Sequence, residues 1–245
     1  MTEGFFFGEK KADSLMSKIY LRGIIQKAKE WEHPCRGFLR ISEAVRESGD
    51  LLKTPKKTRE GYAVSILGLS MQEDTNLDWW VYIPESDPPD GFVMTLKSDS
   101  NNASTGLLRA VEVVEHRSND VGLIERIKSK LKNTSYSLDT ILLCLVLCGG
   151  AYDLLKLSKE LQNSKLELEH IFIAFHGNMI DNINLEKANY NFSLVQVYPK
   201  FNSTTFDFRK QFDDFEKKYK LGQELRLIEG DKIFYGTANK KAINK

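Results

Sequence analysis

The sequence lacks the signature motifs of several large enzyme classes. It has no glycine-rich phosphate loop, no GxSxG elbow and no HExxH pair, which argues against a nucleoside triphosphatase, a serine hydrolase and a zinc protease. Its three cysteines, Cys35, Cys144 and Cys148, form neither a CxxC pair nor a Cys/His spacing typical of zinc. A disulfide framework is therefore not expected, and a reducing cytoplasm is the predicted compartment.

Long apolar runs and an excess of charge are also missing. The longest apolar run, Ile141 to Leu147 with its flanks, is far shorter than the roughly 20 residues that a membrane-spanning helix needs. Residues 1–14 have no basic stretch followed by a long apolar one, so they do not predict a secretion signal. A net charge of +1 gives no global attraction to nucleic acid or membrane, so an anion-binding surface has to be a local patch. We expect a soluble protein that does not bind membranes.

What is present is a series of segments whose apolar spacing changes along the chain. Apolar residues at intervals of three and four predict helices, and short runs rich in β formers and bounded by turn residues predict strands. Helices are expected at 10–32, 37–52, 118–133, 152–164 and 204–222. Strands are expected at 61–70, 77–84, 91–96, 107–116, 140–148, 170–177 and 191–201, with a basic loop at 53–61.

The order of these segments predicts an α/β fold with a mixed sheet flanked by helices. Residues 37–148 read as helix, three strands in an antiparallel meander, helix and strand. The apolar run TILLCLVLC at 140–148 is typical of a central strand covered on both faces. Residues 1–36 are expected to be a helical N-terminal segment, 149–235 a C-terminal strand and helix extension packed on the core, and 236–245 a tail.

Two carboxylates occupy unusual places in the meander. Asp90 in PPDG opens one strand, and Glu112 in AVEVVEH lies inside the next one. A buried, unpaired carboxylate costs several kcal/mol or takes up a proton, so a shared cation would explain both residues. The alternatives are that PPDG is only a turn and that Glu112 lies on the wet face of an edge strand.

This order of elements, with PPDG before the second strand and a glutamate in the third, resembles the PD-(D/E)XK restriction-endonuclease-like superfamily. The resemblance covers residues 37–148 and implies a restriction-endonuclease-like core. It also implies that Asp90 and Glu112 bind Mg²⁺ or Mn²⁺ and that Glu43, on the preceding helix, joins them as a third metal ligand. Mg²⁺ prefers a few hard oxygen ligands from the protein together with waters and substrate phosphate.

The sequence departs from the family where a lysine is expected. That lysine follows the strand glutamate by two positions and helps to activate the attacking water, but here the position is Val114. Three alternatives follow. The lysine function has moved to Lys128 or Lys130 on the next helix or to Lys97 after the second strand. Otherwise His116 replaces the lysine as proton acceptor, or the site is inactive. His116 has an alternative reading as a surface residue at the end of a strand.

The resemblance implies metal-dependent hydrolysis of phosphodiester bonds in DNA, with Asp90, Glu112, His116 and Lys128 as candidate catalytic residues. The alternatives are a catalytically inactive nuclease-like subunit that binds DNA or protein, and an unrelated α/β protein. The resemblance also implies a homodimer or a partner subunit. The basic run at 53–59 offers phosphate contacts, although such runs are more often solvated loops.

Overall fold

The computed structural model describes residues 31–85, 89–98, 104–133, 136, 139–164, 166–175, 191–219, 226–228 and 232–234. The helix expected at 10–32 and the tail at 236–245 therefore fall almost entirely outside the described residues. The helices are α2 (Pro34–Ser48), the short 3₁₀ helix η2 (Leu51–Lys53), α3 (Lys56–Thr75), α4 (Leu123–Asn133), α5 (Leu154–Gln162) and α6 (Phe208–Tyr219). The strands are β1 (Trp79–Tyr82), β2 (Gly91–Ser98), β3 (Ser104–His116), β4 (Thr140–Val146), β5 (His170–Phe175), β6 (Asn191–Tyr198) and β7 (Asn202–Asp207), with a small separate pair, β8 (Arg226–Ile228) and β9 (Lys232–Phe234).

Seven strands form one mixed sheet in the order β1-β2-β3-β4-β5-β6-β7. The pairs β3–β4 and β4–β5 are parallel, and the other neighbours are antiparallel. The predicted α/β class with a mixed sheet and flanking helices is confirmed, and residues 77–116 contain three adjacent antiparallel strands as expected. Strands β5 to β7, which come from the expected C-terminal extension, continue the same sheet.

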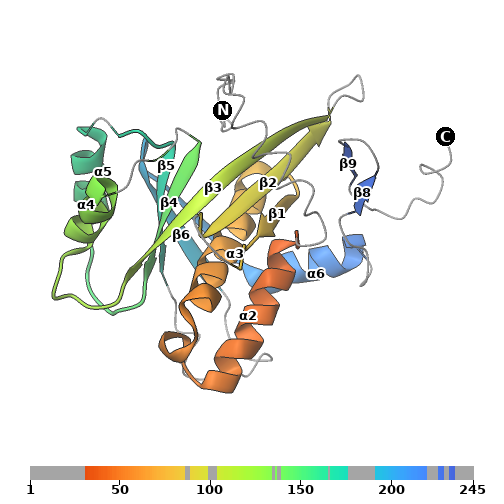
Figure 1. Ribbon diagram of the computed structural model, residues 1–245, viewed down its shortest axis with the longest axis horizontal. Helices are drawn as coiled ribbons and strands as arrows, with labels where there is room; N and C mark the ends of the chain where they lie inside the picture. Colours follow the sequence, from red (N-terminus) through yellow and green to blue (C-terminus); the bar gives the residue numbers. More distant parts are fainter. Residues whose placement is uncertain are drawn as a thin grey trace.

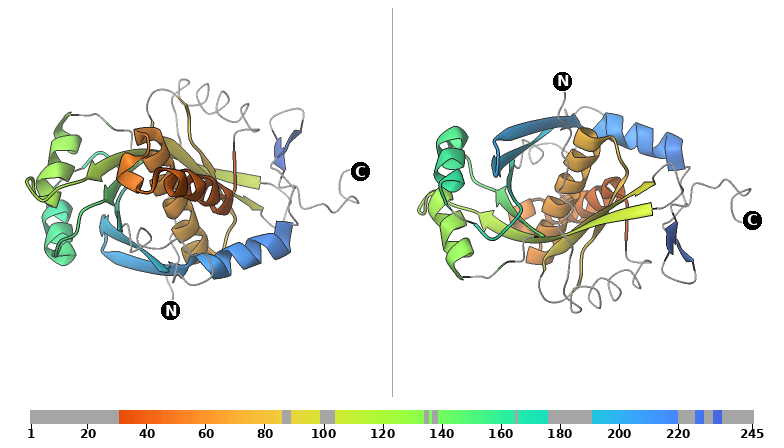
Figure 2. Two further views of the ribbon diagram at one scale, coloured as in Figure 1. Left: turned by 90° about the horizontal axis from the view of Figure 1, so that it is seen from below. Right: turned by 90° about the horizontal axis from the view of Figure 1, so that it is seen from above.

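Helix α3 is the centre of the molecule, and the sheet curls around it (Figures 1 and 2). All residues from Arg59 to Met71 are buried, so this part of the helix is packed on every side and has no face open to solvent. The strand predicted at 61–70 and the basic loop predicted at 53–61 are therefore wrong. A short, continuously apolar run does not distinguish a buried strand from a buried helix, and here tertiary packing decided for the helix.

Helices cover both faces of the central strand, as predicted for 140–148. Ile141, Leu143 and Leu145 pack in the cluster around α3. The alternate residues Leu142 and Cys144 pack in a second cluster. That cluster contains apolar residues of α4 and α5, which lie side by side at the opposite end of the molecule from α6 (Figure 1).

The ends of the elements show two further features. Gly49 ends α2 with a left-handed φ of 73°, a backbone conformation that favours glycine. The helix expected at 204–222 begins only at Phe208, because residues 202–207 pair with β6 as strand β7. Trp79 and Trp80, neighbours on β1, are both buried, one on each face of the sheet. Within the described residues, no helix combines the length and apolar character needed to cross a membrane.

Candidate functional site

Asp90 lies at the mouth of the meander, directly before β2. Gly91 pairs with Val111 across β2 and β3, so continuing the register by one residue places Asp90 opposite Glu112. The Asp90 side chain is half-buried, and its Oδ2 accepts a hydrogen bond from the backbone N–H of Val113 at 2.7 Å. This bond holds the carboxylate against the end of β3.

Glu60, in the first turns of α3, is the nearest acidic partner of Asp90. The two carboxyl groups are within hydrogen-bonding reach of each other. The Glu60 side chain is 3% exposed, and it forms ion pairs with Lys56 Nζ at 2.7 Å and Lys57 Nζ at 3.1 Å. Lys57 Nζ also lies 3.4 Å from the Asp90 carbonyl oxygen. The site is thus a carboxylate pair with two ammonium groups beside it.

Glu60 is not among the residues predicted from the sequence, because residues 53–61 are rich in basic residues and were expected to form a loop. The available signal was the spacing of the charges. Lys56 and Lys57 precede Glu60 by four and three residues, which are the spacings of neighbours on a helix surface. The buried helix that follows carries this charged first turn to the mouth of the sheet.

The surroundings shift the pKa values of the pair in opposite directions. Burial and, after it, the charge of Glu60 raise the pKa of Asp90 to about 6, although the hydrogen bond from the Val113 N–H lowers it. Burial also opposes ionisation of Glu60, but hydrogen bonds from Lys56, Asp90 and Lys57 bring its pKa below the usual value. The pKa of Lys56 is raised, mainly because Lys56 donates a hydrogen bond to Glu60. Near neutral pH, Lys56 and Lys57 offset the charge of Glu60, whereas Asp90 is the carboxyl group whose ionisation is opposed and would be favoured by a bound cation.

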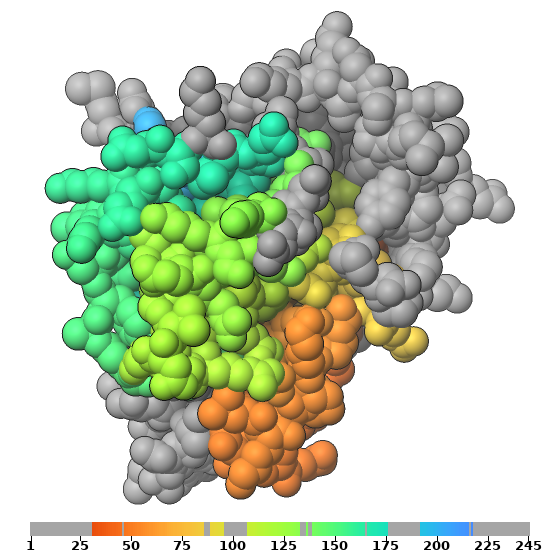
Figure 3. Space-filling model, turned by 60° about the vertical axis from the view of Figure 1, so that its left-hand side comes forward, coloured from red at the N-terminus to blue at the C-terminus, as the bar shows by residue number. Residues whose placement is uncertain are grey.

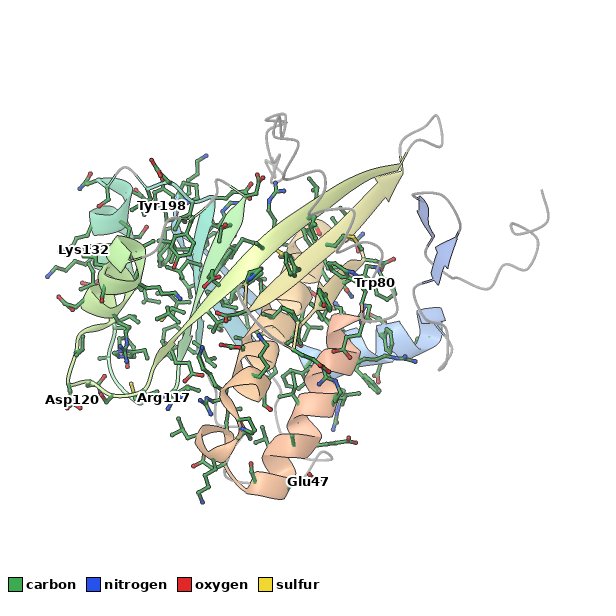
Figure 4. All side chains as sticks on the ribbon, viewed as in Figure 1. Glu47, Trp80, Arg117, Asp120, Lys132 and Tyr198 are labelled. Atoms are coloured by element: carbon green, nitrogen blue, oxygen red, sulfur yellow. The ribbon has the colours of Figure 1, made fainter. Side chains whose placement is uncertain are left out.

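Strand β3 presents one glutamate to each face of the sheet. On the face of α4, Glu112 Oε2 lies 3.2 Å from Lys130 Nζ. On the face of α3, Glu115 Oε1 accepts from Arg59 Nε at 2.8 Å. The charge of Glu112 also raises the pKa of Asp90, so Asp90 interacts with acids from both sides of the sheet edge. Figure 4 labels Arg117, which pairs with Glu115 where β3 ends near the start of α3.

Of the lysines considered for the Val114 position, the structure brings Lys130 to the acids. Lys128 Nζ lies 3.1 Å from Glu160 Oε2 of α5 instead, because residues two apart on a helix point to opposite sides. Lys128, a predicted catalytic residue, therefore contacts α5, and Lys130 is the lysine that contacts Glu112. Lys97 belongs to β2 and lies seven residues, or about 23 Å at 3.3 Å per residue, along the strand from Asp90.

His116 is buried at the end of β3 and faces α5. It is 1% exposed, and its ring meets the ring of Tyr152 edge-on with centroids 5.7 Å apart. Burial lowers its pKa below the usual value, although a hydrogen bond to the Asn119 side chain raises it. The imidazole is therefore neutral near pH 7, and its contacts join β3 to the loop before α5. The reading of His116 as a surface residue is wrong.

Glu43 stands apart from the acids. Its side chain is exposed on α2, and α3 separates α2 from the meander in the chain. Among the contacts of the described residues, none joins Glu43 to Asp90 or Glu112. The helix directly before the meander is α3, so the helical glutamate beside Asp90 is Glu60.

The residues present fit a divalent cation held by two carboxylates. Within the part of the chain that the structure describes, no three His, Cys, Asp or Glu side chains gather closely enough to hold a metal ion. Mg²⁺ commonly uses only one or two carboxylates, with waters and phosphates for the remaining positions. Asp90 and Glu60 supply two such groups, and their mutual repulsion favours a cation between them.

A cavity of about 420 Å³ lies between α4 and α5, away from the carboxylate pair, and neither Asp90 nor Glu60 lines it. Figure 3 shows this face, with yellow-green α4 beside blue-green α5. Asp153 caps α5 by accepting a hydrogen bond from the N–H of Lys156, and the Glu125 carboxylate folds back over Gly122 before α4. Carboxylates of the chain itself thus stand at both helix starts.

Comparisons of the chain with protein-family models, with curated proteins and with solved structures find no match.

Proposed function

We propose that this chain is a metal-dependent, nuclease-like domain that hydrolyses phosphodiester bonds in DNA. The observation that supports it best is the pairing of Asp90 with Glu60 beside Lys56 and Lys57. The element order from α3 to β4, helix, three strands, helix and strand, is the order that the family resemblance implies.

Each group has a role in this proposal. Asp90 and Glu60 hold Mg²⁺ or Mn²⁺ through their oxygens, and the bound ion would supply Lewis acidity and an activated water. Lys56 and Lys57 lie where they can offset the charge of a phosphate. Lys130, beside Glu112, is the candidate for the function of the missing lysine, which is to orient or deprotonate the attacking water.

Cleavage of plasmid and linear DNA with Mg²⁺, with Mn²⁺ and with EDTA tests the proposal. Asp90→Asn and Glu60→Gln should abolish cutting while leaving the circular dichroism spectrum unchanged. The matched control is Glu47→Gln, an exposed glutamate at the far end of α2 (Figure 4), which should cut like the parent. Full activity of the Asp90 and Glu60 double variant would refute the proposed site.

A second candidate function is a non-catalytic subunit that binds DNA or protein with the same fold. The observation that favours it is that Lys56 and Lys57 already neutralise Glu60, at a site whose strand carries Val114 where the family has lysine. It predicts DNA retention with no cutting in either metal. In that case, Asp90→Asn should leave DNA affinity unchanged, which separates the two functions.

A further inference from the structure

A second hollow adjoins the carboxylate pair. This cavity, of about 310 Å³, lies between α2, α3 and the segment that follows β1. Ile41 and Ile83 give it apolar walls, and Arg40, Lys57 and Glu85 give it charged ones. Its volume is at the lower end of the range for small-molecule sites, and it is too small for a duplex.

Lys57 connects this hollow to the carboxylates. Its side chain lines the cavity, and its Nζ lies 3.1 Å from Glu60 Oε2 and 3.4 Å from the Asp90 carbonyl oxygen. A phosphate placed beside the carboxylate pair would therefore lie next to the cavity mouth. The next nucleotide along the strand would then have the cavity within its reach.

The polar groups of the walls suit a nucleotide. Two cations, Arg40 and Lys57, line the cavity together with one carboxylate, Glu85. Arg40 also pairs with Glu32 and Lys57 with Glu60, so what the cavity offers a phosphate is N–H donors and no net positive charge. Arg40 forms an ion pair with Glu32 at 2.5 Å, which fixes the guanidinium while its other N–H groups can donate to a ligand. The apolar walls suit the face of a base or a sugar.

We propose that this cavity binds one nucleotide of the DNA strand, with its base out of the stack, next to the bond that is cut. The inference rests on the proposed function, because it takes the strand to cross Asp90 and Glu60. A base that enters such a pocket must leave its neighbours, so single-stranded or frayed DNA binds better than a closed duplex.

Glu85 adds a preference among bases. A carboxylate accepts a hydrogen bond from the exocyclic amino group of cytosine, whereas thymine presents an oxygen at the same place. The pocket therefore favours cytosine over thymine. Glu85 is exposed, so the hydrogen bond to its carboxylate should correspond to only about a three- to tenfold difference in affinity.

The test uses full-length Asp90→Asn protein in EDTA, where no strand is cut, and follows binding by fluorescence anisotropy. The probes are labelled oligo-dC, oligo-dT and a duplex of equal length. We expect oligo-dC to bind about three- to tenfold more tightly than oligo-dT, and the duplex to bind less tightly than oligo-dC. Equal affinity for the two single strands would overturn the proposal.

Three second substitutions in this background probe the walls. Thr58→Tyr, which fills the cavity, and Arg40→Gln should each weaken oligo-dC binding about tenfold, whereas Glu85→Gln should abolish the preference for dC over dT. Lys217→Gln on α6, which removes an exposed cation, is the charge-matched control and should change nothing. Unchanged oligo-dC binding by both Thr58→Tyr and Arg40→Gln would refute the pocket.

Cleavage by the parent protein is measured separately, so the two proposals fail independently. Loss of cutting together with pocket-dependent oligo-dC binding would reject the nuclease function and retain the nucleotide site. Cutting that is insensitive to Thr58→Tyr and Arg40→Gln, with equal use of dC and dT strands, would reject the nucleotide site alone.

Discussion

Asp90 Oδ2 accepts a hydrogen bond from the backbone N–H of Val113 at 2.7 Å, which ties the start of β2 to the end of β3. The contact keeps an aspartate partly desolvated between Glu60 and Glu112, both of which raise its pKa. Carboxylates with strongly perturbed pKa values cluster at functional sites.

Asp90→Asn should stabilise the protein at neutral pH. The unfolded chain releases the Asp90 proton near pH 3.9, whereas the folded protein keeps it to about pH 6. The folded state thus binds more protons in this window, and the free energy of unfolding falls as pH rises through it. Asparagine imitates the protonated acid, so the gain should be on the order of 1 kcal/mol at pH 7.5, discounted for partial exposure. Urea unfolding at pH 7.5 and 4.5 measures it, and an equal gain at both pH values would contradict the assignment.

Mg²⁺ should raise the melting temperature of the protein at pH 7.5, because a ligand that binds only the folded state stabilises it. The rise should disappear in Asp90→Asn and Glu60→Gln and persist in Glu47→Gln. It should also weaken below about pH 6, where a proton competes for Asp90. Differential scanning fluorimetry over a Mg²⁺ titration shows these effects, and a shift that survives Glu60→Gln would exclude Glu60 as a ligand.

Lys130→Met should slow cleavage on the order of 100-fold, because it removes the ammonium beside Glu112. Lys128→Met is the matched control. It makes the same charge change on the same helix, but its partner is Glu160 of α5. Single-turnover rates with excess protein separate the chemical step from binding. Equal rates for the two variants would leave the function of the missing lysine unassigned.

Arg59→Met should destabilise the fold by about 3 kcal/mol, since it leaves a buried glutamate without its partner. The Arg59 side chain is 5% exposed. Besides Glu115, its guanidinium bonds the carbonyl oxygens of Thr54 and Leu52. Arg117 is the other partner of Glu115, and the Arg117 side chain is 47% exposed. Arg117→Met should therefore cost less than about 1 kcal/mol. Chemical denaturation gives the free energy of unfolding of both variants. Similar losses would show that Arg59 stabilises the fold no more than the exposed Arg117 does.

Local pattern was enough to predict much of the sheet and the position of one acid. Alternating β formers between turn residues placed the meander of residues 77–116, and the continuous apolar run at 140–148 placed a strand covered on both faces. These signals work because a strand buries every second side chain when one face is covered and every side chain when both are. Proline and glycine around Asp90 marked the start of β2 for the same local reason.

Tertiary structure alone decided the centre and the partners of the site. The run from Gly61 to Ser70 is equally apolar as a strand or a helix, and only the curled sheet around it makes the helix the better packed choice. That choice brought Glu60, not Glu43, to Asp90 across thirty residues of chain. The packing of α4 likewise places Lys130 beside Glu112 and Lys128 beside Glu160 of α5. Sequence spacing determines which residues share a face of one element, but which faces meet depends on how the whole core is filled.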